Sequence, residues 1–320
     1  KVFLLILLRM SKKFVDQIRS NNQIAISKAI TSIESGDILN KNFLDEIYKF
    51  STSSLRIGIT GPPGAGKSTL TDKLIDKFLQ SNKSVGVIAV DPTSPFTGGA
   101  LLGDRVRMNN YLWNDDVFIR SLGARGELGG LSKKTQEIGD ILAASGKDII
   151  IYETVGVGQG EHDIIKQVDI VIVVLVPESG DEIQLMKAGI IEIGDIFVIN
   201  KSDRQGSNKL AQSLKNILHS TFSKKKLEPE VFLTSADRGD GIDSFFNGID
   251  VVNDVFVNNG TLTIKRNNRL KNRVFQIVKD QLLAEFWTSK KINRLNKSIK
   301  NINNTNDSPS KIAEMMIDEK

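Results

Sequence analysis

The sequence contains no cysteine among its 320 residues and only two histidines, His162 and His219. The lack of cysteine excludes a disulfide framework, a thiolate metal site and a cysteine nucleophile. With so few histidines, a site for a soft metal ion is also disfavoured. The apolar and charged fractions, 40% and 25%, are those of an ordinary globular protein.

The chain also has little excess charge and no long apolar run at its start. Lys and Arg number 43 against 38 Asp and Glu, and the basic residues are scattered apart from Lys224–Lys226, so we expect no nucleic-acid partner. The apolar stretch Val2–Leu8 is too short to span a bilayer, and we expect no membrane partner. No small-residue cleavage site follows it, and Met10 resembles a natural start. We therefore interpret residues 1–9 as a non-native extension and expect a cytoplasmic protein.

Seven short runs rich in Ile and Val alternate with longer amphipathic segments between Leu55 and about Ile249. Strands that lack polar alternation and are separated by helices predict an α/β fold, with a mostly parallel sheet of about seven strands covered on both sides. The predicted strands are Leu55–Thr60, Ser84–Val90, Val117–Leu122, Asp148–Tyr152, Ile170–Val176, Ile196–Ile199 and Val231–Thr234.

Helical patterns flank this region on both sides. Apolar residues recur at helical spacing from Phe14 to about Ile33 and again near Phe43–Phe50. After Gly260 an apolar stripe returns, and Ser308-Pro309-Ser310 predicts the start of a last helix. We divide the chain into an N-terminal helical arm (10–52), a main domain (53–258) and a C-terminal helical arm (259–320). The last arm is interpreted as a dimerisation arm, with packing on the main domain as the open alternative. Its stripe is Leu270, Val274, Ile277, Val278, Leu282 and Phe286.

A phosphate-binding loop is predicted directly after the first strand. The segment from Gly61 to Ser68 fits G-x-x-x-x-G-K-[ST] and opens an amphipathic helix, which is the context that the motif requires. The glycines let backbone N–H groups converge on the phosphates, and Lys67 reaches the β- and γ-phosphates. A chance glycine-rich turn is the alternative, and the flanking strand and helix disfavour it. The expected nucleotide contacts are Gly61, Pro62, Pro63, Gly64, Ala65, Gly66, Lys67, Ser68 and Thr69.

Oxygen ligands for Mg²⁺ are predicted near this loop. The Ser68 hydroxyl is the first, and Glu153 stands at the end of a strand where a phosphate-loop protein places its Walker B acid. Asp91 and Asp104 are further metal or water-mediated ligands, although acids at such positions also form turns or helix caps. Gly156 is predicted to sense the γ-phosphate, and Lys67, Glu153 and Gly156 form the expected catalytic set.

Two later segments predict recognition of guanine. Asn200-Lys201-Ser202-Asp203 follows a strand, and the Asp203 carboxylate would accept from the N1–H and exocyclic amine of guanine. Adenine presents no such pair of donors there. Thr234-Ser235-Ala236 follows the next strand, and Ser235, Ala236 and Asp237 are expected to contact the base. The order of these motifs predicts a GTPase.

Slow intrinsic hydrolysis is expected, because Val157 stands where Ras-like proteins carry the glutamine that positions water. We therefore expect a partner to accelerate turnover, with Gln159 as a partial substitute. Arg125 could supply charge in cis or be a surface residue, and the role of His162 stays open. Lys187, with Asp181 and Glu182, forms either a nucleotide-sensitive loop or a solvated helix start.

Taken together, these motifs resemble the methylmalonyl-CoA mutase-associated GTPases (MeaB, MMAA), also labelled ArgK or LAO/AO transport system ATPases. The resemblance rests further on Asp91-Pro92-Thr93-Ser94, Thr97-Gly98-Gly99, Leu102-Gly103-Asp104-Arg105, Glu153-Thr154-Val155-Gly156-Val157-Gly158-Gln159 and Gly180-Asp181-Glu182. It implies a SIMIBI-type phosphate-loop fold and a homodimer.

The same resemblance implies a GTPase chaperone of an adenosylcobalamin-dependent methylmalonyl-CoA mutase. Such a protein couples Mg²⁺-dependent GTP hydrolysis to cofactor loading, protection or reactivation of the mutase, and a cobalamin adenosyltransferase is a further candidate partner. By the same analogy Glu178–Lys187 is an additional switch loop. Two alternatives remain: an ATP-dependent kinase or ATPase of a basic amino-acid transport system, which Asn200–Asp203 disfavours, and a metal-insertion GTPase, which the scarcity of Cys and His disfavours.

Overall fold

The computed structural model describes residues 12–35, 41–92, 110–111, 113–124, 128–154, 166–178, 190–222, 228–299 and 308–318. The chain divides into two compact units, Lys1–Thr263 and Ile264–Lys320. Residues 1–9, interpreted above as an extension, lie outside the described residues.

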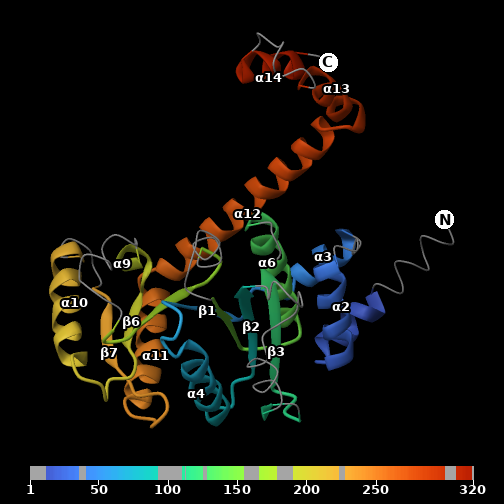
Figure 1. Ribbon diagram of the computed structural model, residues 1–320. Helices are drawn as coiled ribbons and strands as arrows, with labels where there is room; N and C mark the ends of the chain where they lie inside the picture. The colour runs from blue at the N-terminus through green and yellow to red at the C-terminus, as the bar shows by residue number, and fades with distance from the viewer. Residues whose placement is uncertain are drawn as a thin grey trace. The chain divides into compact units, whose positions relative to one another are not determined.

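A seven-stranded sheet forms the centre of the first unit (Figure 1), and every strand pair in it is parallel. This confirms the predicted sheet. Its order is β3-β2-β4-β1-β5-β6-β7, which places β1 between β4 and β5. The strands are β1 (Leu55–Thr60), β2 (Val85–Pro92), β3 (Val117–Ala124), β4 (Ile149–Glu153), β5 (Ile170–Leu175), β6 (Ile196–Ile199) and β7 (Glu230–Leu233).

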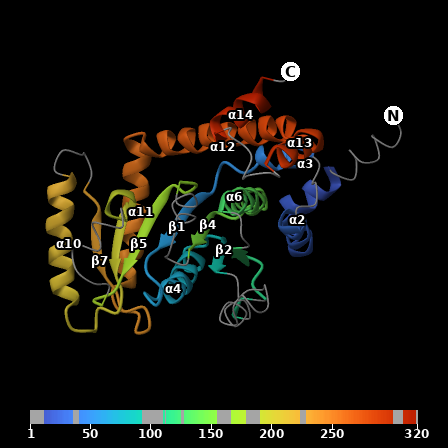
Figure 2. The ribbon, with the colours of Figure 1, turned by 45° about the horizontal axis from the view of Figure 1, so that its top comes forward.

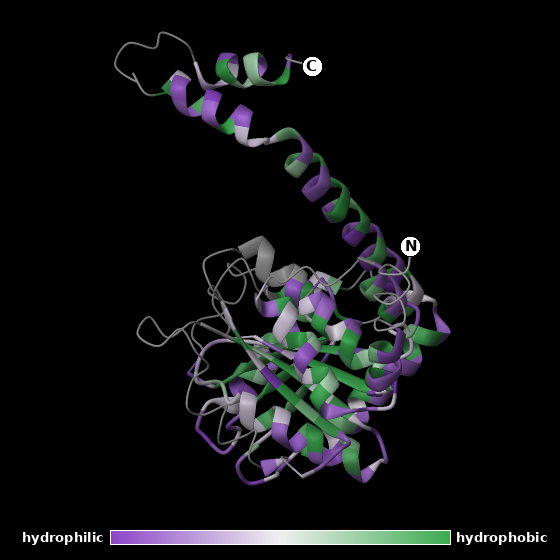
Figure 3. Ribbon diagram, turned by 90° about the vertical axis from the view of Figure 1, so that its right-hand side faces the viewer, coloured by the Kyte–Doolittle hydropathy of each residue, from purple (hydrophilic) through white to green (hydrophobic). Residues whose placement is uncertain are grey.

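Helices cover both faces of the sheet. Because side chains alternate along a strand, Ile88 and Val90 of β2 face one apolar cluster, whereas Val85 and Val87 face the other. Figure 2 shows α6 and α4 on opposite sides of the strands, and Figure 3 shows that the strands are mainly apolar. The first cluster includes residues of α2 (Gln23–Ser35), α3 (Lys41–Tyr48), α6 (Leu128–Ala144), α9 (Ile190–Ile193) and α10 (Ser207–Phe222), and the second residues of α4 (Lys67–Gln80) and α11 (Ile242–Asn258).

The helical pattern predicted from Phe14 to Ile33 is divided into two helices, residues 12–19 and α2. Asn21 adopts a left-handed backbone (φ 58°), and the Asn22 Oδ1 atom accepts from Ala25 N at 2.9 Å, so a turn and a new helix start separate the two. Asn21 Nδ2 also donates to the Asp115 carbonyl at 2.8 Å. Lys147 Nζ donates to the same carbonyl at 2.6 Å. The turn thereby joins the N-terminal helices to the segment before β3.

The second unit contains α12 (Thr261–Phe286) from Ile264 onward, α13 (Ser289–Ile299) and α14 (Pro309–Ile317). The predicted start of the last helix is confirmed: Ser308 is its N-cap, and its hydroxyl accepts from Lys311 N. Lys291 Nζ donates to Met316 O at 3.2 Å, which joins α13 to α14. No residue of α12 or α13 is buried. Within the described ranges, no helix combines the length and the apolar character needed to cross a membrane.

Candidate nucleotide-binding site

The predicted site segments follow β1, β4, β6 and β7. Because all strands are parallel, their carboxyl ends lie along one edge of the sheet, where α/β proteins bind ligands. β1 lies between β4 and β5, so the loop after β1 has neighbours on both sides. The fold therefore places the phosphate-loop motif at the centre of this edge.

Two glycines fix the shape of the phosphate loop. Gly61 has φ 142°, and a Cβ atom there would lie 2.0 Å from the Val174 carbonyl oxygen. Gly66 is left-handed (φ 82°), and a Cβ atom there would lie 2.4 Å from Asn200 Nδ2. Gly66 is also the N-cap of α4, and no side chain caps that end of the helix. The N-terminus of α4 is therefore suited to receive a phosphate group.

Two lysines hold the carbonyl groups of the loop. Lys67 is buried, and its Nζ donates to the carbonyls of Gly61 at 2.7 Å and Pro62 at 2.9 Å. Lys201 reaches across from the segment after β6 and donates to the Gly64 carbonyl at 2.7 Å. The Lys67 ammonium group thus lies within the loop, where the motif predicts contact with phosphate.

Ser68 and Glu153 meet beside this loop. β4 runs alongside β1 with Glu153 opposite Ile59, so Glu153 is the last residue of its strand rather than the residue after it. The Ser68 hydroxyl donates to Glu153 Oε1. A hydroxyl and a carboxylate in contact provide two hard oxygen atoms, the ligand type that Mg²⁺ prefers. Both residues fit the predicted metal site.

The remaining predicted ligands are not placed by the described structure. Asp91 lies in β2, with its backbone opposite Gly123, but its side chain lies outside the described part, as does all of Asp104. Among the residues that are described, no group of three or more His, Cys, Asp and Glu side chains forms a metal site. Outside the described residues lie also Arg125, Gly156, Val157, Gln159, His162, Asp181, Glu182 and Lys187.

Asn200 connects the phosphate loop to the segment after β7. Its Nδ2 donates to the Ala65 carbonyl at 2.9 Å, while its Oδ1 accepts from Ala236 N at 3.0 Å and from the Thr234 hydroxyl at 3.2 Å. Asn200 is 2% exposed, and the three partner residues are buried. The side chain expected to contact nucleotide therefore fixes three loops relative to one another.

Asp203 is held by the segment after β7. The Ser235 hydroxyl donates to Asp203 Oδ1 at 3.1 Å, and Arg238 Nη2 lies 3.2 Å from Asp203 Oδ2. The Ser235 hydrogen bond is the main cause that lowers the pKa of Asp203, and the Arg238 charge lowers it further. The carboxylate is therefore ionised at neutral pH and able to accept hydrogen bonds from a base.

Two contacts in this region could not be expected from the motifs. Arg238 lies beyond the Thr234-Ser235-Ala236 segment, and nothing in the sequence marks it as a partner of Asp203. Arg204 Nη1 donates to Glu178 Oε1 at 2.6 Å, which joins the segment after β6 to the segment after β5. Both pairings depend on how separate loops meet at the edge of the sheet.

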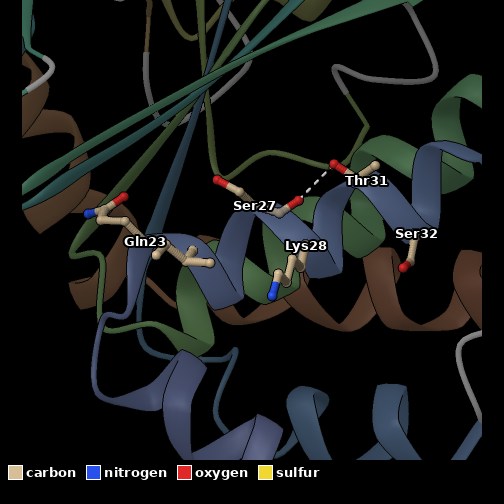
Figure 4. A pocket seen from close by; sticks show the side chains of 6 residues that line it. Gln23, Ser27, Lys28, Thr31 and Ser32 are labelled. Carbon is tan, nitrogen blue, oxygen red and sulfur yellow. Dashed lines mark hydrogen bonds between the residues drawn. The ribbon is translucent and has the colours of Figure 1, made fainter.

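A pocket on α2 lies away from these loops. It is lined by Gln23, Ile24, Ser27, Lys28, Thr31 and Ser32, all from α2 (Figure 4). The Thr31 hydroxyl donates to the Ser27 carbonyl at 2.9 Å within the helix. The lining residues include no acid and only one base, Lys28, so the pocket has no set of groups suited to nucleotide or metal chemistry.

Comparison with known proteins places the chain among GTPases. The family model described as "Methylmalonyl Co-A mutase-associated GTPase MeaB" matches residues 26–291. A Pyrococcus abyssi protein named as a GTPase is 39% identical over 314 residues, which cover 97% of both chains. Escherichia coli GTPase ArgK is 36% identical and covers 73% of both chains.

A relative from Caenorhabditis elegans, the mitochondrial methylmalonic aciduria type A homolog, is 31% identical over 96% of this chain and 82% of its own. Among solved structures, the crystal structure of a LAO/AO transport system kinase has a TM-score of 0.72. It is 24% identical and covers 97% of both chains. That likeness shows a shared fold.

Proposed function

The chain belongs to the family of methylmalonyl-CoA mutase-associated GTPases, and we propose that it acts as a GTP-driven chaperone of an adenosylcobalamin-dependent methylmalonyl-CoA mutase. The observation that carries this proposal is the family match over residues 26–291, which includes most of α2 and all of α3 and α12 as well as the nucleotide site. We further propose that it acts in the cytoplasm.

GTP hydrolysis itself follows from the family and the fold. Relatives that match most of the chain are named GTPases, and the sheet carries a phosphate loop after its central strand. We assign phosphate binding to the backbone from Gly61 to Thr69 and to Lys67. Base recognition is assigned to Asp203, supported by Asn200 and Ser235.

Mg²⁺ is part of the proposed site. The Ser68 hydroxyl would hold the ion directly, and the Glu153 carboxylate would hold it directly or through water, because the two side chains already meet beside the phosphate loop. The ion would neutralise charge on the β- and γ-phosphates. Lys67 adds a second positive charge on the same side of the nucleotide, and the loop backbone orients the phosphates.

A partner should complete the catalytic site. Val157 cannot hydrogen-bond through its side chain to an attacking water, which is the function of the glutamine at this place in Ras-like proteins. We therefore propose slow turnover by the protein alone and acceleration by the mutase. Such an arrangement would restrict hydrolysis to the complex and so couple it to cofactor loading, protection or reactivation.

We propose that α12 supports a homodimer. Leu270, Val274 and Leu282 are 44%, 51% and 60% exposed, and the helix has no buried residue. Figure 3 shows apolar and polar residues interspersed along it. A long amphipathic helix gains its stability mainly from packing of its apolar face. Light scattering of the wild type and of Val274→Glu/Leu282→Glu should show a dimer and a monomer; a monomeric wild type would refute this part.

Co-purification with the mutase tests the chaperone role. The full chain is mixed with a cobalamin-dependent methylmalonyl-CoA mutase, and phosphate release from GTP is measured with and without it. Complex formation and faster GTP hydrolysis would support the proposal. A protein that hydrolyses GTP but neither binds the mutase nor responds to it would refute the chaperone role and leave the GTPase assignment intact. A parallel sample with a cobalamin adenosyltransferase tests that second candidate partner.

The alternative of an ATP-dependent kinase is tested with the same protein. Preferential hydrolysis of ATP over GTP would favour it. The Asp203 carboxylate, ionised and held at the edge of the sheet, instead favours a base that offers two N–H donors.

A further inference from the structure

Arg238 lies on a tight turn next to the proposed base-reading carboxylate. Arg238 N donates to the Ser235 carbonyl at 3.0 Å, and Gly239 N donates to the same carbonyl at 2.8 Å. Ser235 N in turn donates to the Asp240 carbonyl at 3.0 Å, and the two residues form an isolated antiparallel bridge. The closed turn therefore fixes Arg238 relative to Ser235, and both side chains reach Asp203.

The two side chains hold different oxygen atoms of Asp203. Ser235 donates to Oδ1, and the Arg238 guanidinium lies 3.2 Å from Oδ2. A carboxylate oxygen can accept two hydrogen bonds. Neither of these two contacts by itself fills its oxygen, and a backbone hydrogen bond at Asp203 adds a third contact to the carboxylate. The carboxylate still presents two differently held oxygens toward a base such as guanine, which offers two adjacent N–H donors.

Orientation is the reason why two contacts are needed. The terminal torsion of an aspartate side chain is broad, so a single hydrogen bond leaves the second oxygen poorly placed. A base that donates two parallel hydrogen bonds needs both oxygens in its plane. Ser235 alone fixes Oδ1, whereas Ser235 and Arg238 together fix the plane of the carboxylate.

We propose that Arg238 is a specificity-determining positioning residue: it orients the Asp203 carboxylate so that the exocyclic amine of guanine is recognised together with N1–H. This inference rests on the assignment of Asp203 as the base reader. Arg238 is 65% exposed and Asp203 is 30% exposed. The contribution of Arg238 is therefore that of an exposed ion pair, about two- to fivefold in affinity.

Inosine triphosphate provides the probe, because inosine keeps N1–H and lacks the exocyclic amine. In Arg238→Ala the carboxylate loses its fixed plane, which weakens two-point binding more than one-point binding. The affinity for GTP should fall about two- to fivefold. The affinity for inosine triphosphate should fall less, so the preference for GTP over inosine triphosphate decreases.

Arg204→Ala is the matched control. Arg204 is the next residue after Asp203 and its charge also lowers the pKa of Asp203, but its guanidinium contacts Glu178. Removing it takes away a similar charge without releasing the carboxylate. We expect Arg204→Ala to keep the wild-type preference for GTP over inosine triphosphate. Arg238→Lys keeps the positive charge but loses the planar guanidinium, and its preference should lie between those of the wild type and Arg238→Ala.

The affinities are measured by calorimetry on the full chain with Mg²⁺, and melting curves confirm that each variant is folded. An unchanged or increased preference for GTP in folded Arg238→Ala would overturn the inference, as would an equal loss in Arg204→Ala. Asp203→Ala distinguishes failure of the base-reading assignment from failure of the Arg238 proposal. If Asp203→Ala leaves the affinity for GTP intact, the base-reading assignment fails. If Asp203→Ala weakens GTP binding but Arg238→Ala does not, only the Arg238 proposal is refuted.

Discussion

Replacing Asn200 by alanine should destabilise the whole edge of the sheet that carries the nucleotide site. The change removes one donor and one acceptor from a buried position. The Ala65 carbonyl and the Ala236 N–H, 2.9 Å and 3.0 Å from the Asn200 amide, would lose their partner. The Thr234 hydroxyl, at 3.2 Å, can rotate to another acceptor and adds less to the loss.

The expected loss of stability follows from the Ala65 carbonyl and the Ala236 N–H, which would both lose their partner. Each buried polar group left without a partner costs about 1–3 kcal/mol, which gives about 2–6 kcal/mol for the pair. Water that enters the space left by the amide offsets part of this, so we expect about 2–4 kcal/mol. For a unit of this size the melting temperature should fall by roughly 5–15 °C.

The assay is thermal unfolding of nucleotide-free protein, followed by calorimetric titration with GDP. Nucleotide-free protein isolates the contribution of the loops from that of bound ligand. Asn208→Ala is the control, because Asn208 is exposed at the start of α10. It should shift the free energy of unfolding by less than about 0.5 kcal/mol. A melting temperature of Asn200→Ala within about 2 °C of wild type would show that the loops do not depend on this side chain.

Three further substitutions test separate parts of the account. Lys67→Ala should lower GTP turnover about 100-fold or more, because it removes the positive charge within the phosphate loop, and retained phosphate release would discredit that loop. Asp203→Ala should weaken GTP binding about tenfold or more without affecting ATP, and an unchanged GTP affinity would remove the base-recognition argument. Burial lowers the pKa of Lys147 from 10.5 to about 8, against the raising effect of Asp116 and its neighbours. Between these values the unfolded chain binds more protons, so the Lys147 contribution to stability rises with pH in this window. The melting temperature of wild type relative to Lys147→Met should therefore increase from about pH 8 to pH 10, and a constant difference would contradict the shifted pKa.

The central sheet could be predicted because its strands are buried on both faces. Runs such as Ile170–Leu175 contain no polar residue, and their alternation with amphipathic helices is typical of a parallel sheet buried between two layers of helices. The phosphate loop was equally predictable, because its motif requires glycine at positions 61 and 66, and in the structure close neighbours exclude a Cβ atom at both Gly61 and Gly66.

The break between the two N-terminal helices and the contacts between separate loops could not be predicted from the sequence pattern. The apolar spacing from Phe14 to Ile33 continues through the turn at Asn21, because the residues on both sides of that turn pack into the same cluster. Arg238 and Asn200 acquire their contacts only when segments 34–36 residues apart, and for the Asn200–Ala65 contact 135 residues apart, meet at the sheet edge. Neither contact has a sequence period or spacing that would reveal it.

Calorimetric titration of the folded, nucleotide-free protein with GDP and Mg²⁺ tests the central claim most directly. We predict one molecule of GDP bound per chain and no measurable binding of ADP under the same conditions. Absence of GDP binding, or equal binding of the two nucleotides, would contradict the account of a guanine site built from the phosphate loop and Asp203.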